Sequence, residues 1–214
     1  MATTRVGFSS TWIVVVAVMA RSGERNEPLV LAAKDVDSGM LVEIGVPKLL
    51  GIRHPPYPTD SRALLITIDA HELVACHLAL DWRVPERIVD LMVEFRNITN
   101  GQSGLRVGGL PGALLLFGRP AIDGLVAGNS PEQMRRRLAA VVSLFDSMQA
   151  TLDLGRAQLR GRYMCAVARI ESVGVPIDRR FLDSLSRNWS AVRARVVEIV
   201  DQDFGVYRGL RLDH

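Results

Sequence analysis

The stretch SSTWIVVVAVMARSGE, from Ser9 to Glu24, contains an uncharged apolar run from Trp12 to Ala20. Four consecutive β-branched residues, Ile13 to Val16, give this run a high propensity for strand structure. The run is too short to cross a bilayer, which takes about 20 apolar residues, so we expect no membrane partner. It predicts a buried strand near the start of the chain.

A secretory signal peptide is the alternative interpretation of the same run. Arg5 would be its charged beginning, and Val18-Met19-Ala20 would be its cleavage site. The leading segment has only one charge and is polar over a long distance, which argues against a signal peptide. The two interpretations predict different proteins, and the rest of the chain has to separate them.

The composition is that of a globular protein with a small excess of basic charge. Of the 214 residues, 48% are hydrophobic and 23% are charged, which predicts one domain or one domain with an appended piece. The net charge is +3, and nearly all basic residues are arginine, because lysine occurs only at Lys34 and Lys48. Arginine binds phosphates through its planar guanidinium, so nucleic acid is a compatible partner, although GC-rich coding produces the same bias.

The cysteines and histidines do not form a metal motif. Cys76 and Cys165 lie far apart in apolar helical patterns, which predicts buried free thiols in a reducing compartment. We therefore expect a cytoplasmic protein. His71 and His77 are close to Cys76, but their spacing matches no closed four-ligand zinc site, so we expect no metal there.

Segments with strand and helix patterns alternate along the first part of the chain. The patterns predict strands at 12–20, 28–34, 36–44, 63–68 and 87–91, and helices at 70–80, 92–98 and 110–117. Ser130 followed by Pro131 predicts the start of a helix that continues through Met148. The Gly-rich segment between Gly101 and Gly112 lacks the Lys-Ser/Thr ending of a P-loop and is expected to be a loop.

The last part of the chain has only helical patterns. One helix is predicted from Leu154 to Val173, and Gly174 ends it. Asp178 is expected to cap a final single helix. The apolar stripe of the first helix is formed by Leu159, Tyr163, Val167 and Ile170. The apolar face of the second helix is formed by Phe181, Leu185, Trp189, Val192, Val196 and Val200. We expect Trp82 and Trp189 to be core residues rather than base-stacking platforms. Strands first and helices later predict an α/β body with a helical C-terminal extension.

Three stretches carry a resemblance to a known family. They are RALLITIDAHELVACHLALDW (62–82), HLALDWRVPERIVDLMVEFRNITNG (77–101) and LRGRYMCAVARIESVGVPIDRRFLDSL (159–185). The first two resemble the proofreading-exonuclease-like domain of bacterial and phage family A DNA polymerases. The third resembles the segment that leads from that domain into the polymerase region. The resemblance implies an RNase-H-like mixed sheet flanked by helices in residues 1–150, and a helical extension in residues 151–214.

The same resemblance implies where a nuclease site would lie. Active members of the family remove nucleotides from the 3′ end of single-stranded DNA with two divalent metals held by four acids. In this chain Val15 and Ala17 stand where the Asp-x-Glu pair of the first strand is expected. Glu72, or Asp69 beside it, matches the third acid, and Arg137 stands at the fourth. A single carboxylate, Glu72, would remain as a residual acid.

These replacements predict an exonuclease-like domain of the DNA polymerase I type that is catalytically inactive. It would retain nucleic-acid binding or a structural role, and no cofactor is expected. One alternative is an active metal-dependent 3′–5′ exonuclease with relocated ligands, which would use Mg²⁺ or Mn²⁺ and acids such as Asp35, Asp37 or Glu43. Another is a protein-interaction module on the same fold. The partners implied are single-stranded or primer-template DNA and a polymerase region in trans.

Arginines on the predicted late helices, and one arginine upstream of them, are candidates for contacts with nucleic-acid phosphates. These candidates are Arg119, Arg135, Arg136 and Arg137. Arg156 and Arg160 share another helix face and are further candidates. The alternative for each is an ordinary solvent-exposed helix face. Asp90 has two interpretations as well, because it follows a predicted strand and could face a cleft or cap the next helix.

Overall fold

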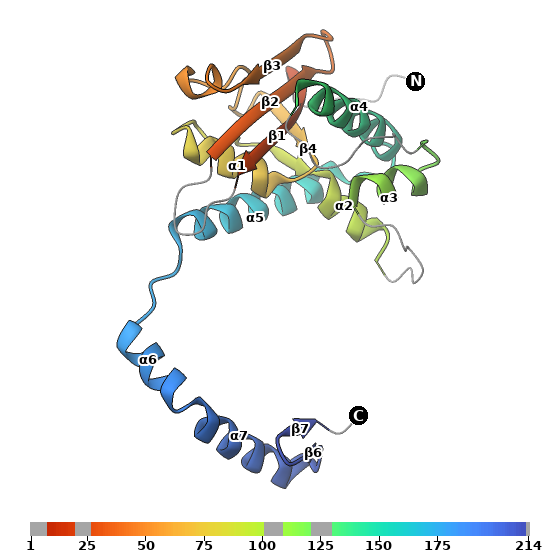
Figure 1. Cartoon of the computed structure of the whole chain (residues 1–214). Helices are drawn as coiled ribbons and strands as arrows, with labels where there is room; N and C mark the ends of the chain where they lie inside the picture. Colours follow the sequence, from red (N-terminus) through yellow and green to blue (C-terminus); the bar gives the residue numbers. More distant parts are fainter. Residues whose placement is uncertain (1–7, 20–26, 101–108, 121–129, 213–214) are drawn as a thin grey trace. The chain divides into compact units, whose positions relative to one another are not determined.

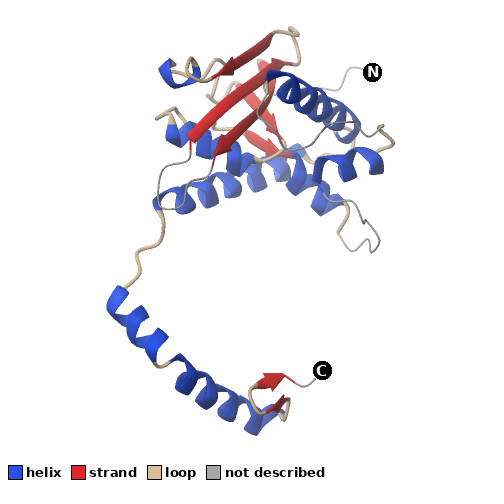
Figure 2. Cartoon of the chain, viewed as in Figure 1, coloured by secondary structure: helices blue, strands red, loops and turns tan. Residues whose placement is uncertain are grey.

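The computed structural model describes residues 8–19, 27–100, 109–120 and 130–212. The chain divides into two compact units, Met1–Val173 and Gly174–His214. The first unit therefore extends beyond the predicted boundary at residue 150, because it includes the long helix that follows. Figure 1 labels the elements of both units, and Figure 2 colours them by secondary structure.

A five-stranded mixed sheet forms the centre of the first unit (Figure 2). Its strands, in spatial order, are β3 (Leu41–Gly45), β2 (Glu27–Asp35), β1 (Ser10–Met19), β4 (Ala63–Thr67) and β5 (Ile88–Asp90). β1, β2 and β3 are antiparallel neighbours, whereas β1, β4 and β5 are parallel neighbours. The predicted mixed sheet is confirmed. β3 begins later than predicted, because the chain turns between Asp35 and Met40.

β1 is the central strand, and both of its faces are buried. Trp12, Val14 and Val16 belong to one hydrophobic cluster, and the residues between them belong to another on the opposite face. Because successive side chains of a strand point to opposite faces, covering both faces requires an uninterrupted apolar run. β1 is thus the buried strand that the β-branched residues Ile13 to Val16 predict.

Helices cover the two faces of the sheet (Figure 1). α1 (Ala70–Ala79) and α5 (Leu154–Val173) pack on one face, and α4 (Pro131–Met148) packs on β1 and β2 at the other. α3 (Gly109–Leu116) contacts α4, α2 (Leu91–Ile98) contacts β5 and α3, and the short helix η1 (Leu49–Gly51) contacts β2. Ser130 and Gln133 form a capping box at the start of α4, so the predicted helix start is confirmed.

α5 packs through small residues instead of through its large apolar stripe. Its buried positions are Ala157, Gly161, Cys165 and Ala168. The predicted stripe is wrong as a packing face, since Leu159, Tyr163 and Ile170 are 67%, 68% and 57% exposed. Small side chains let the helix backbone approach β5 closely, which large ones on that face would prevent. The helix ends where predicted, at Gly174, whose positive φ of 77° suits glycine.

The second unit contains two helices instead of the single one predicted. They are α6 (Arg179–Arg187) and α7 (Trp189–Phe204), separated at Asn188, and are followed by β6 (Tyr207–Arg208) and β7 (Arg211–Leu212). Asp178 caps α6 through the backbone N–H groups of Arg180 and Phe181, as predicted. Trp189 is 54% exposed, so its assignment to a core is wrong, whereas Trp82 is buried as predicted.

Two general properties follow from the described part of the chain. None of its helices is both long enough and apolar enough to span a membrane. Cys76 and Cys165 are free, buried thiols. Burial raises the pKa of Cys76 to about 12, and it also raises the pKa of Cys165, so neither forms a reactive thiolate at neutral pH.

Candidate functional site

An ion pair lies where β1, α1 and α4 meet. Arg137 on α4 donates from Nη2 to Oε2 of Glu72 on α1 at 2.8 Å. It also donates from Nη1 to the carbonyl of Val16 on β1 at 3.2 Å. The second carboxylate oxygen of Glu72 accepts from the N–H of Val18 at 3.4 Å. The side chains of Glu72 and Arg137 are 25% and 29% exposed, so the pair is partly buried.

Local structure fixes Glu72 at this place. Asp69 caps α1 and accepts from the N–H of Glu72 at 3.0 Å, which makes Asp69 a capping residue instead of a partner in the site. On the other side, the register of β1 against β2 shifts between Ala17 and Val18, and Val18 lies opposite Pro28. Proline has no N–H, so the strand pairing is weakened at this end of β1.

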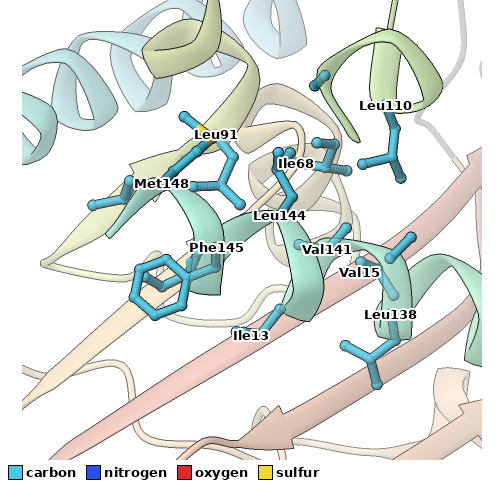
Figure 3. Close-up of a cluster of buried hydrophobic side chains, with 14 of the residues drawn as sticks. Ile13, Val15, Ile68, Leu91, Leu110, Leu138, Val141, Leu144, Phe145 and Met148 are labelled. Carbon is cyan, nitrogen blue, oxygen red and sulfur yellow. The ribbon is translucent and has the colours of Figure 1, made fainter. Parts of the chain in front are cut away.

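Val15 and Ala17 lie beside the ion pair but point into the core. Both are buried, in the cluster that β1 shares with α4. Figure 3 shows Val15 among side chains from α4, with Leu138 and Val141 close to it. Neither residue has an oxygen atom in its side chain. The structure thus brings all four positions of the predicted acid set to one end of β1, and only Glu72 carries a carboxylate.

The residues at this place do not fit a pair of divalent metals. Mg²⁺ and Mn²⁺ bind carboxylate and carbonyl oxygens, and the single carboxylate here already accepts from a guanidinium. Among the residues that the structure describes, no group of three or more His, Cys, Asp or Glu side chains could hold a metal ion. Any metal at Glu72 would also have to lie beside the fixed positive charge of Arg137.

The acids considered as relocated ligands have other contacts. Asp35 accepts from the Ser38 hydroxyl at 2.6 Å within the turn that follows β2. Asp37 accepts from the N–H of Thr11 at 3.1 Å, near the beginning of β1. Glu43 on β3 binds Arg135. These contacts tie each acid to its own part of the fold.

The arginines predicted to bind phosphates on α4 are paired with acids. Arg135 binds both carboxylate oxygens of Glu43, at 2.6 and 2.8 Å. Arg136 forms an ion pair with Glu132, and Arg137 forms one with Glu72. The other arginines named from the sequence also have partners: Arg119 donates to Ser147, Arg156 pairs with Asp153, and Arg160 pairs with the buried Glu94. These pairs neutralise most of the positive charge on α4.

Asp90 caps a helix, in agreement with one of its two interpretations. Its carboxylate accepts from the N–H groups of Met92 and Val93 in the first turn of α2. It also accepts from the N–H of Ala70 at 2.8 Å, in the first turn of α1. Asp90 is buried, and burial raises the pKa of its carboxyl group above the usual range. It therefore links the starts of two helices and does not face a cleft.

His77 belongs to a buried aromatic network that the sequence pattern does not reveal. Its Nε2 is 2.8 Å from the hydroxyl of Tyr57, and its Nδ1 is 2.8 Å from the carbonyl of Arg83. The ring packs edge-on against Trp82. Burial lowers the pKa of His77 to about 4, so the imidazole is neutral at physiological pH. His71 has different surroundings, with its Nε2 atom beside the carboxylate of Glu171.

Comparison with known proteins identifies the fold. No family model and no curated protein matches the chain. Solved structures do match, and they include three with the following values. An apo form of a nuclease has 12% identity and a TM-score of 0.53, over 78% of this chain and 86% of that chain. The POL domain of Pol1 from M. smegmatis in complex with a DNA primer-template and dNTP has 14% identity and a TM-score of 0.62, over 90% of this chain and 33% of that chain. NrnC from Brucella melitensis bound to pGG has 11% identity and a TM-score of 0.54, over 77% of this chain and 85% of that chain.

The RNase-H-like exonuclease fold implied by the sequence resemblance is confirmed by these matches. The chain spans about a third of the Pol1 chain that it matches. The first unit ends at Val173, so a match over 90% of the chain extends into the second unit as well. Identities of 11–14% establish the fold alone.

Proposed function

We propose that this chain is an exonuclease-like domain of the DNA polymerase I type that lacks two-metal nuclease activity and retains nucleic-acid binding. The ion pair between Arg137 and Glu72 is the observation that carries the proposal. It lies at the end of β1 where the family resemblance expects four acids, and it contains the single carboxylate of those four positions.

The chemistry of the two-metal reaction explains why this arrangement favours inactivity. One metal has to generate a hydroxide and the other has to stabilise the leaving oxygen, and both need anionic ligands. Val15 and Ala17 provide none, and they are packed in the core. Arg137 keeps its positive charge at every physiological pH, so it competes with a cation for Glu72.

The ion pair instead has a structural role in this proposal. Arg137 connects α4 to α1 through Glu72 and to β1 through the Val16 carbonyl. Glu72 connects α1 to the N–H of Val18. Hydrogen bonds to charged groups each contribute about 1.5–3 kcal/mol when they are shielded from water, and partial exposure reduces this. The pair thus joins three elements at a place where metal coordination would otherwise join them.

A nuclease assay tests the loss of activity. The full chain is incubated with an end-labelled single strand in Mg²⁺ and separately in Mn²⁺, with Glu72→Ala as the control variant. We expect no trimming above buffer in either metal. Metal-dependent trimming by the wild type that disappears in Glu72→Ala would overturn the proposal and support an active nuclease with relocated ligands.

Nucleic-acid binding is the second part of the proposal. One of the matched structures contains a DNA primer-template, and another is bound to pGG. The net charge of this chain is +3, and nearly all of its basic residues are arginine, which supports nucleic acid as a partner here too. The free thiols of Cys76 and Cys165 are compatible with the cytoplasm as the compartment in which it would act. Binding that vanishes even at low salt would refute this part without affecting the nuclease result.

A second candidate function is docking to a polymerase region supplied by another chain. The second unit exposes large apolar side chains on α6 and α7, including Phe181 (67%) and Trp189 (54%). The Pol1 match extends into this unit and covers only a third of the Pol1 chain. Size-exclusion chromatography with the polymerase region of a family A enzyme tests this candidate. Co-elution that Phe181→Asp abolishes is expected, and separate elution would refute it.

A further inference from the structure

A cavity of about 520 Å³ opens on the first unit between the start of α5 and the loops that precede β4 and β5. We call it the α5 cavity, and it is lined by Ser61, Glu86, Arg87, Gly155, Gln158, Leu159 and Arg162. Ser61 lies two residues before β4, which is parallel to β1, and Arg87 directly precedes β5, which is parallel to β4. They are therefore level with the beginning of β1, whereas the ion pair of Arg137 lies at its end.

The α5 cavity contains two arginines that no carboxylate neutralises. Within the described ranges, Arg87 and Arg162 have no ion pair, unlike the three arginines of α4. The guanidinium of Arg87 lies 5.0 Å from the ring centroid of Phe8, a cation–π contact that holds it in place. Glu86 is the one acid in the lining, and it is already paired with Arg83. The lining therefore has a positive excess.

The remaining lining residues suit a phosphate-bearing ligand. The hydroxyl of Ser61 is a further donor beside the two guanidinium groups. The amide nitrogen of Gln158 donates to the carbonyl of Leu154, which fixes that side chain against the helix. Leu159 is 67% exposed at the rim and offers an apolar surface to a sugar or base. The volume falls within the range of about 300–1,000 Å³ typical of small-molecule sites.

We propose that the α5 cavity binds the phosphate group of a nucleotide, with Arg87 and Arg162 as the charged donors. Arginine forms two parallel hydrogen bonds to a phosphate. Two guanidinium groups at one cavity therefore favour a phosphate over a singly charged anion. The proposal rests on the proposed function only in the choice of a nucleotide as ligand. The phosphate has two sources, a free mononucleotide or the backbone of a single strand, and the experiment separates them.

The experiment compares the full wild-type chain with Arg87→Gln/Arg162→Gln. The control is Arg96→Gln/Arg169→Gln, which removes the same net charge from two exposed arginines of α2 and α5 that have no carboxylate partner in the described residues and lie outside the cavity lining. The probes are a labelled oligothymidylate of about twelve nucleotides, thymidine 5′-monophosphate and inorganic phosphate. Thermal denaturation checks that each variant folds. If the variant with Arg87→Gln does not fold, the single variant Arg162→Gln, at an exposed position, takes its place in the comparison.

Two results would support the proposal. For the oligothymidylate, the loss of two phosphate contacts in Arg87→Gln/Arg162→Gln, the cavity variant, is expected to reduce the slope of log affinity against log salt concentration by about 1.4. Between about 50 and 200 mM salt, the wild type should therefore lose about sevenfold more affinity than the cavity variant. The control is expected to keep most of the wild-type slope. Thymidine 5′-monophosphate that competes with the strand, and fails to bind the cavity variant, identifies a free nucleotide as the source. Strand binding without such competition identifies the backbone.

Other results would overturn it. Equal strand binding by the wild type and the cavity variant shows that the contacts are elsewhere, and the proposed function survives. An equal loss in the control variant shows that only net charge matters. Absence of binding by the wild type to all three probes removes both the cavity site and the nucleic-acid part of the proposed function. The nuclease assay remains a separate test of the inactive site.

Discussion

Replacing Gly161 by alanine is expected to push α5 away from the sheet. A Cβ atom at this position would lie 2.1 Å from the carbonyl oxygen of Ile88 and 2.8 Å from its carbonyl carbon. Both are backbone atoms of β5, so they cannot move aside by a change of rotamer. The helix or the strand has to shift as a whole, which disturbs the packing on this face of the sheet.

The size of the effect follows from that overlap. A carbon atom packs at about 3.5 Å from its neighbours, so the two elements have to separate by more than about 1 Å. A gap of about 0.5–1 Å already loses a quarter to a half of the attraction between the packed surfaces. Overpacked cores lose about 1–3 kcal/mol, and alanine returns about 1 kcal/mol of helix propensity. Because the overlap is with backbone atoms, we expect a loss at the upper end of this range, and therefore a net loss of about 2 kcal/mol in the free energy of unfolding.

Gly155→Ala is a matched control on the same helix. Its Cβ would meet the Asp153 carboxylate at 3.5 Å, an ordinary contact, so only the helix propensity changes. We expect this variant to be up to about 1 kcal/mol more stable than the wild type. Urea denaturation followed by far-UV circular dichroism measures both. If Gly161→Ala and Gly155→Ala are equally stable, α5 does not pack on β5 in the way the structure describes.

Three further predictions concern the site and the core. In a double-mutant cycle, Glu72→Met and Arg137→Met are expected to couple by about 1–2 kcal/mol in urea denaturation, and additive effects would contradict the ion pair. The variant Val15→Asp/Ala17→Glu/Arg137→Asp is expected to be destabilised without metal and to regain about 2.7 kcal/mol in Mn²⁺ at a hundred times its dissociation constant, whereas the wild type is unaffected by Mn²⁺. His77 has a pKa lowered to about 4 by burial, so the unfolded chain takes up its proton first as pH falls. The neutral His77 makes its full contribution to the free energy of unfolding above about pH 6.5. About 3 kcal/mol of this free energy is lost as the pH falls to 4, and His77→Gln should largely remove that loss.

The elements of the first unit could be predicted because their signals are local. The apolar run of β1 has to fill two buried faces, which leaves no room for a polar residue between Trp12 and Ala17. The capping box at Ser130 depends only on residues three positions apart. These signals do not depend on the partner against which the element packs.

The packing face of α5 could not be predicted in the same way. Its sequence has a stripe of large apolar residues and a face of small ones, and the stripe gives the stronger pattern. The helix uses the small face because the β5 backbone approaches Gly161 more closely than any side chain would allow. That distance depends on the sheet, so it is not encoded in the periodicity of the helix. The exposed side chains of Leu159 and Tyr163 show the consequence.

The four positions of the site were inferred from the family resemblance, but the contact between Arg137 and Glu72 was not. The two residues are 65 positions apart, and their contact depends on how α4 lies across β1. A signal was nevertheless present in the sequence. Where a basic residue replaces one acid of a cluster and another acid remains, an ion pair between them is the arrangement of lowest electrostatic cost.

The replacements at the site depend on one another. With metals absent, acids at positions 15 and 17 would lie in the core that β1 forms with α4, and burying them unpaired would be costly. Once those positions are apolar, Glu72 alone would be a partly buried charge, and Arg137 compensates for it. Restoring an acid at position 137 alone would put two carboxylates together without a cation. The four-acid arrangement and the present one are therefore two self-consistent sets of residues, and single substitutions between them are each expected to destabilise the fold.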